Sequence, residues 1–124
     1  MPLERNLNII SLPASADLSA SQFCIVAVDT DGRVALPSGS VGKVIGVLQN
    51  KPKALGEAAQ VAIGGVSRCQ SGGSIAPGDW VKSDAAGLGL VTTTATNVIV
   101  GRAVSAGAGG SGLIFEVLIG PQQL

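Results

Sequence analysis

Residues 23–36 read Phe-Cys-Ile-Val-Ala-Val-Asp-Thr-Asp-Gly-Arg-Val-Ala-Leu, and this stretch predicts a β-hairpin. Residues 23–28 and 33–36 are short apolar runs rich in β-branched side chains, which is typical of strands. The Asp and Gly residues at 29–32 supply the chemistry of a tight turn. The same four residues begin like a calcium loop, but Arg33 and Leu36 stand where further oxygen ligands would be needed, so we interpret them as a turn.

Short segments of the same kind recur at intervals of about ten residues, which indicates an all-β barrel or sandwich. The further strand candidates are residues 7–11, 44–49, 59–63, 66–69, 80–82, 89–93, 98–104 and 113–119. No helix-pattern segment or Gly-Lys-Ser/Thr follows the glycine pairs at 64–65 and 72–73, so these pairs are interpreted as turns rather than phosphate cradles. The one helical turn expected is residues 17–20, capped by Asp17.

The composition excludes several classes of function. The chain has 124 residues, room for one domain. Its net charge is zero and only 13% of its residues are charged, so it lacks the basic surface that nucleic acids or acidic membranes require. It has no His, which removes the usual general base and metal ligand. We therefore expect no active site, no small-molecule substrate, no cofactor and no metal.

The cysteines and the first residues bear on the compartment. Cys24 and Cys69 lie 45 residues apart in apolar surroundings, and we interpret them as buried free thiols. The longest apolar run, residues 23–28, is far shorter than the ~20 residues that cross a bilayer. Residues 1–6 lack the basic start of a secretory signal, so the sequence predicts a soluble protein made in the cytoplasm.

The N-terminal region differs from the rest of the chain. We divide the protein into residues 1–22, an extended arm and tether, and residues 23–124, the β domain. Residues 2–13 form the arm, with a strand-forming centre at residues 7–11. The alternative is that this segment is an ordinary first strand of the barrel. Near the other end, residues 105–112 are low in complexity and are expected to be a flexible loop.

A weak internal repeat is visible. Ile45-Gly46 leads through a loop to Gly56 and then to residues 61–64, and Val100-Gly101 leads through a loop to Gly112 and then to residues 117–120. The second set lies 55 or 56 positions after the first. Either one long-looped hairpin is used twice, or the recurrence is chance in a chain rich in Gly and Val.

Residues 73–87 hold the most distinctive side chains. Trp80 is the only Trp, and it is either a core anchor or a contact between protomers. Lys82 invites comparison with the modified Lys of biotin and lipoate carrier domains, but it precedes the turn at residues 84–87 instead of occupying it. We therefore favour a solvated strand side chain. Asp79 and Asp84 flank this strand, and no pocket is indicated around them.

Several of these segments, taken in order, resemble the small capsid cement, or head decoration, proteins of tailed bacteriophages. The similarity runs over about residues 23–120 and is carried by residues 44–52, 56–57, 61–66, 75–79, 83–87 and 100–104. The resemblance implies a compact β-tulip or barrel-like domain that forms homotrimers on the outer surface of the expanded head, at the junctions between capsomers. It also implies an N-terminal arm that reaches the major capsid protein, and no catalytic residues.

An arm this apolar is expected to bind by adding a strand to an exposed sheet edge. Its candidate capsid-binding residues are Leu3, Arg5, Leu7, Ile9 and Ile10. Three such arms on one trimer would raise avidity by 10² to 10⁴ in typical cases. The function predicted is that of a structural virion protein. The alternative is a non-catalytic adaptor or a biotin/lipoate-carrier-like domain.

Overall fold

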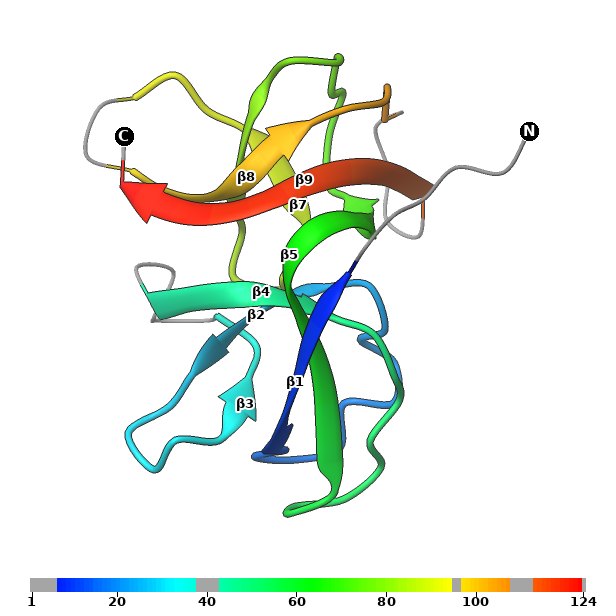
Figure 1. Cartoon of the computed structure of the whole chain (residues 1–124), viewed down its shortest axis with the longest axis vertical. Helices are drawn as coiled ribbons and strands as arrows, with labels where there is room; N and C mark the ends of the chain where they lie inside the picture. The colour runs from blue at the N-terminus through cyan, green and yellow to red at the C-terminus, as the bar shows by residue number, and fades with distance from the viewer. Residues whose placement is uncertain (1–6, 38–42, 95–96, 108–112, 124) are drawn as a thin grey trace.

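The computed structural model describes residues 7–37, 43–94, 97–107 and 113–123, and these residues form nine strands and no α-helix (Figure 1). The strands are β1 (Asn8–Pro13), β2 (Ile25–Val28), β3 (Val34–Ala35), β4 (Val44–Leu48), β5 (Ala58–Ser71), β6 (Trp80–Ser83), β7 (Gly89–Val91), β8 (Val98–Ala103) and β9 (Leu113–Gln123). The all-β fold predicted from the sequence is confirmed.

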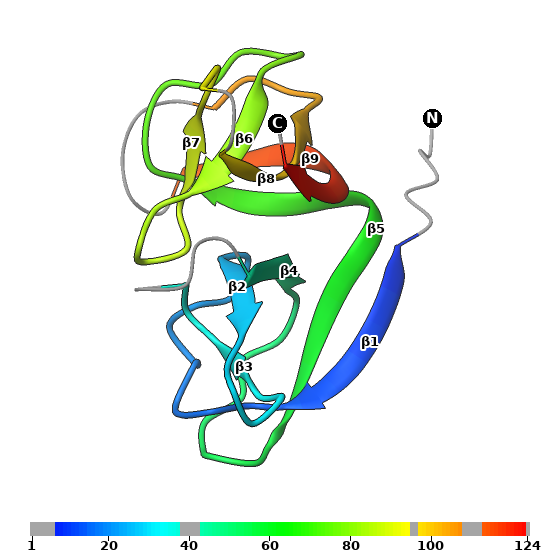
Figure 2. The same cartoon turned by 90° about the vertical axis from the view of Figure 1, so that its left-hand side faces the viewer.

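The strands form two groups that share β5. The first part of β5 lies between β1 and β4, and β4 continues through β2 to β3. A parallel bridge from Ala14 to Val34 closes this group into a ring. The second part of β5 pairs with β9, which continues through β8 and β6 to β7, and the parallel pair Ser71 and Gly89 closes the second ring. Figure 2 shows the two groups, one above the other, with β5 running through both.

The prediction of two strands separated by a turn at residues 64–65 was wrong. β5 is one strand of 14 residues. The strand changes partners at this point: Ala62 pairs with Val47 in the first group, and Gly65 pairs with Ile119 in the second. Gly65 has a φ of 86°, a backbone conformation open to glycine, so the pair bends the strand without ending it.

The internal repeat is confirmed and extends over most of the described chain. We call residues 7–63 the first repeat and residues 64–119 the second repeat. Strand partners recur 55 to 57 positions later: Val26–Gly46 as Val81–Gly101, Val47–Ala62 as Arg102–Leu118, Ala27–Ala35 as Lys82–Leu90, and Ile10–Val61 as Ser67–Val117. The two closing bridges, Ala14–Val34 and Ser71–Gly89, also correspond. Because the register repeats in every one of these pairs, the chance interpretation is wrong.

The hairpin turns also correspond. The Asp29 carboxylate accepts hydrogen bonds from the N–H groups of Asp31 and Arg33, and the Asp84 carboxylate accepts them from Ala86 and Leu88. The turn predicted for residues 29–32 is therefore confirmed, and the structure shows why Asp opens it. Within the described part of the chain, the second turn alone forms a hydrogen bond to the other repeat: the carbonyl of Gly87 accepts the N–H of Ile25 at 2.7 Å.

This difference leads to a first prediction. Asp84→Ala removes two charge-assisted hydrogen bonds from a turn that supports the contact between repeats, and we expect it to lower the free energy of unfolding by about 2 kcal/mol. The equivalent Asp29→Ala should cost about half as much, since its turn is exposed. Urea unfolding of both variants measures the two losses. Equal losses would show that the turn at residues 84–87 adds nothing to the contact between repeats.

Residues 17–20 do not form the expected helical turn, although Asp17 does cap the turn that is there. The Asp17 carboxylate accepts hydrogen bonds from the backbone N–H and the hydroxyl of Ser19, which lowers the pKa of Asp17. The N–H of Ser21 then bonds to the carbonyl of Leu18. These contacts form an isolated turn that the chain does not continue into a helix.

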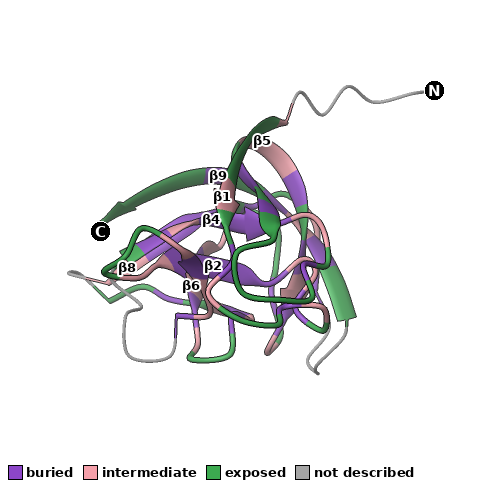
Figure 3. Cartoon of the chain, turned by 90° about the horizontal axis from the view of Figure 1, so that it is seen from below, coloured by how far each residue is buried: buried purple, intermediate pink, exposed green. Residues whose placement is uncertain are grey.

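Two core clusters fill the rings. The first-repeat cluster includes Val26, Leu48 and Val61, and Ala14 and Leu18 of the expected tether are also buried in it. The second cluster contains the core of the second repeat, with Phe115 as its largest side chain. Figure 3 shows the burial of β2 and β4 and the exposure of β9 toward its C-terminal end.

Both thiols behave as predicted. Cys24 and Cys69 are free and buried, and burial raises the pKa of each. The thiols are therefore neutral and unreactive at neutral pH. Of the expected flexible loop, residues 108–112 lie outside the described residues, while Gly107 is buried and bridges Ile75.

Candidate functional site

β1 presents an edge to the outside of the molecule. It pairs with β5 on one side, and no strand of the described residues pairs with its other side (Figure 2). Ile9 and Ile10 are 47% and 36% exposed. An exposed strand edge with apolar side chains is a template for another strand, so this edge is a candidate binding site.

The hydrogen-bonding pattern shows which groups of β1 face outward. The N–H of Ala14 bonds to the carbonyl of Glu57, which fixes the alternation along the antiparallel pair. The N–H groups of Ile10 and Leu12 are then directed at β5, and those of Ile9 and Ser11 are directed away from it. Pro13 stands at a position that needs no donor, as expected for an edge strand.

The other arm residues are placed differently. Leu3 and Arg5 lie outside the described residues. Leu7 is half-buried and packs against the second core cluster. The described part of the expected arm is thus joined to its own domain by Leu7 and by the pairing of β1 with β5, and the division of the chain at residue 22 stays a prediction.

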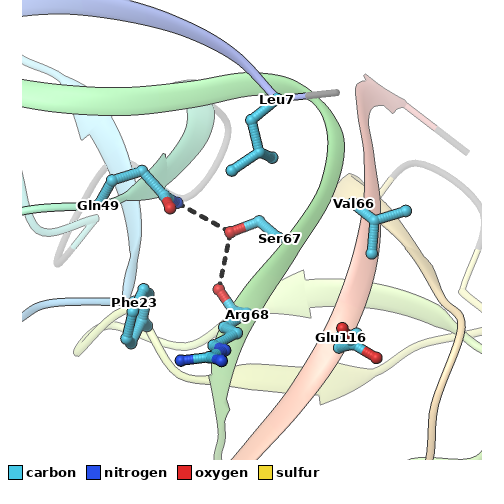
Figure 4. A pocket seen from close by; sticks show the side chains of 7 residues that line it. All are labelled: Leu7, Phe23, Gln49, Val66, Ser67, Arg68 and Glu116. Carbon is cyan, nitrogen blue, oxygen red and sulfur yellow. Dashed lines mark hydrogen bonds between the residues drawn. The ribbon is translucent and has the colours of Figure 1, made fainter. Parts of the chain in front are cut away.

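A cavity of about 290 Å³ lies where the two repeats meet (Figure 4). It is lined by Leu7, Phe23, Gln49, Val66, Ser67, Arg68 and Glu116. A hydrogen bond of 2.8 Å from the Gln49 amide to the Ser67 hydroxyl crosses it. Phe23 has a φ of 65°, which is unusual for a bulky residue, and its carbonyl accepts the N–H of Gln70 from the other repeat.

Trp80 belongs to neither core cluster. It is half-buried on β6, and the guanidinium carbon of Arg102 lies 3.8 Å from the centre of its ring. This is a cation–π contact between neighbours on β6 and β8. Arg102 and its neighbour on β9, Leu118, were not singled out from the sequence. The repeat could have identified them, since their equivalents Val47 and Ala62 are apolar.

The remaining candidates are strand and turn residues. Lys82 lies within β6, opposite Leu90 of β7, before the turn and not at its tip. The Asp79 carboxylate accepts the N–H of Ala76, so both Asp79 and Asp84 stabilise turns. The described residues contain no group of three metal-ligating side chains and no helix able to span a membrane.

The fold and these surfaces define a β protein with an outward strand edge and exposed apolar side chains, features suited to binding another protein. A family model described as phage cement protein matches residues 5–119, and the chain belongs to this family. It is therefore a structural, capsid-stabilising component of a phage virion. No curated protein matches the chain.

Proposed function

We propose that this protein binds the outer surface of the expanded capsid as a homotrimer and holds neighbouring capsomers together at their junctions. The N-terminal residues pair with a strand of the major capsid protein. The observation that carries this proposal is the outward edge of β1, with the exposed Ile9 beside an N–H group directed away from β5. In this proposal Leu3 and Arg5, which precede β1 in the sequence, contribute to the same contact with the capsid.

The trimer gives this contact its strength. One short added strand contributes only a few main-chain hydrogen bonds, each worth about 1 kcal/mol net. Three arms on one trimer bind together. Separating the capsomers would therefore require the strand pairing of several arms with the capsid protein to break at the same time. Binding of this kind rests on main-chain pairing and on the three-fold repetition of the contact, and it needs no reactive group.

The proposal predicts that Ile9→Pro weakens head binding while the fold is preserved. Proline removes the outward N–H of residue 9, and the bonds between β1 and β5 remain. Ile9→Ala is the matched control, because it removes the same side chain and keeps the N–H. With about 1 kcal/mol lost per arm over three arms, Ile9→Pro should bind expanded heads about a hundredfold more weakly than Ile9→Ala.

Co-sedimentation with expanded heads measures this difference, and circular dichroism checks the fold. Deletion of residues 2–6 provides a second test, since it removes Leu3 and Arg5 and leaves β1 intact. If both variants decorate heads as well as the Ile9→Ala protein does, the arm does not bind the capsid.

A further inference from the structure

The two repeats contact each other through unlike surfaces. Ile25, Val47 and Ala62 are cross-strand neighbours on β2, β4 and β5, and we call them the covered row. All three are fully buried, and they pack in the same cluster as Phe115 and Val81 of the second repeat. The outer face of the first repeat is therefore covered by the second repeat.

The second repeat has the same row, but it is open. The equivalent neighbours are Trp80, Arg102 and Leu118 on β6, β8 and β9, and we call them the open row. Leu118 is 49% exposed, Arg102 is exposed and stacks on Trp80, and none of the three belongs to a core cluster. A face that is buried in one repeat is thus left to solvent in the other.

The counterpart surface is also open. Hydrogen bonds between the two repeats include those from the Ile25 N–H to the Gly87 carbonyl, from the Gln70 N–H to the Phe23 carbonyl, and from the Gln49 amide to the Ser67 hydroxyl. The residues of the first repeat equivalent to Gly87, Gln70 and Ser67 are Gly32, Pro13 and Ile10. All three are exposed.

We propose that the open row is an interface between copies of this chain, covered by the first repeat of a second copy in the same way as the second repeat covers the first within one chain. The proposal rests on the proposed homotrimer and names the surface that forms it. It assigns Ile10, expected from the sequence to bind the capsid, to the contact between copies. Pro13, at the C-terminal end of the outward edge of β1, also belongs to the contact between copies. The Ile9 end of that edge stays with the capsid, and the Ile9 side chain lies on the opposite face of β1 from Ile10.

The residues at the two open surfaces are chemically matched. Within one chain, Gln49 and Ser67 form a hydrogen bond between the repeats. In the contact between copies, Val104 takes the place of Gln49 and Ile10 takes the place of Ser67. These side chains are apolar and 45% and 36% exposed, so a polar pair is replaced by an apolar pair on both sides at once. Pro13 is equivalent to Gln70, whose N–H bonds to the carbonyl of Phe23 within one chain. Because proline has no N–H, no donor is left unsatisfied at this position.

The contact is heterologous, because each copy offers its second repeat to the first repeat of the next. Such a contact either closes into a ring or continues as an open filament. In a closed ring of three copies, every open row is covered, and so is every first-repeat surface that contains Ile10, Pro13 and Gly32. It also places six repeats in succession, with the same packing inside each chain and between chains.

A cysteine pair tests the interface directly. Ile10→Cys together with Val104→Cys should form disulfides between chains on mild oxidation, because these positions correspond to the hydrogen-bonded Ser67 and Gln49. The two native thiols are buried, so their background is low. Covalent trimers on a non-reducing gel support the proposal, and the two single variants serve as controls. A trimeric protein that does not cross-link would overturn the interface and leave the proposed function standing.

A charge substitution separates copies from capsid. Leu118→Asp should abolish the trimer in light scattering. Ile114→Asp, on the same face of β9 and 43% exposed, should not, because its first-repeat equivalent Ala58 is itself exposed. If Leu118→Asp stays trimeric and only head binding is lost, the open row faces the capsid and the proposal is wrong. Cross-linked trimers of a protein that does not bind expanded heads would support the interface and overturn the proposed contact of the trimer with the capsid.

Discussion

Gly101→Ala and Gly46→Ala are each expected to lower the free energy of unfolding by at least about 3 kcal/mol. These glycines are equivalent positions on β8 and β4. A Cβ atom at Gly46 would collide with the carbonyl oxygen of Ala62, and one at Gly101 with that of Leu118. Since the obstacle is backbone on the neighbouring strand, no rotamer change relieves it. The strands would have to separate.

Gly120→Ala is the control for both variants. Gly120 lies in β9, an added Cβ would meet nothing within 4 Å there, and its φ is not positive. It should change stability by no more than about 0.5 kcal/mol. Thermal or urea unfolding of the three proteins gives the comparison. If Gly101→Ala is as stable as Gly120→Ala, close strand approach does not explain the two glycines.

The turns and glycine pairs show how far the sequence alone predicts this fold. Period-two runs and Asp/Gly turns are local signals, and they placed the hairpins correctly because a turn is fixed by its own few residues. The glycine pair at residues 64–65 was misread, since a turn and a bend in one long strand require the same residue type. Only the change of partners from Val47 to Ile119 distinguishes them, and that is a contact distant in the chain.

The candidate surfaces were less predictable, for a related reason. Ile25 and Val26 are both apolar, so periodicity could not tell which face of β2 meets its own repeat and which meets the other. Trp80 was identified by its rarity, yet its neighbours Arg102 and Leu118 resembled ordinary surface residues. Extending the recurrence of Gly46 and Gly101 along the chain would have aligned these residues with Val47 and Ala62. The sequence therefore held the information in the repeat and not in any single motif.

The cores of the two repeats differ at one pair of equivalent positions, where the large and the small residue are exchanged between the two strands. The first repeat places Val34 and Ala59 in its core, and the second repeat has Gly89 and Phe115 at the equivalent positions. A Cβ at Gly89 would lie 2.9 Å from the Phe115 ring. The small residue on β7 thus makes room for the large one on β9.

Phe115→Ala alone should lower the free energy of unfolding by about 3–5 kcal/mol, because it leaves a cavity in a core where Phe115 is 1% exposed. Gly89→Val alone should lower it by about 1–3 kcal/mol through overpacking. The double variant rebuilds the first repeat's pair, so its loss should be smaller than that of Phe115→Ala alone. Unfolding of the four proteins completes the cycle. Additive losses would mean that the two repeats, despite their shared register, do not share interchangeable cores.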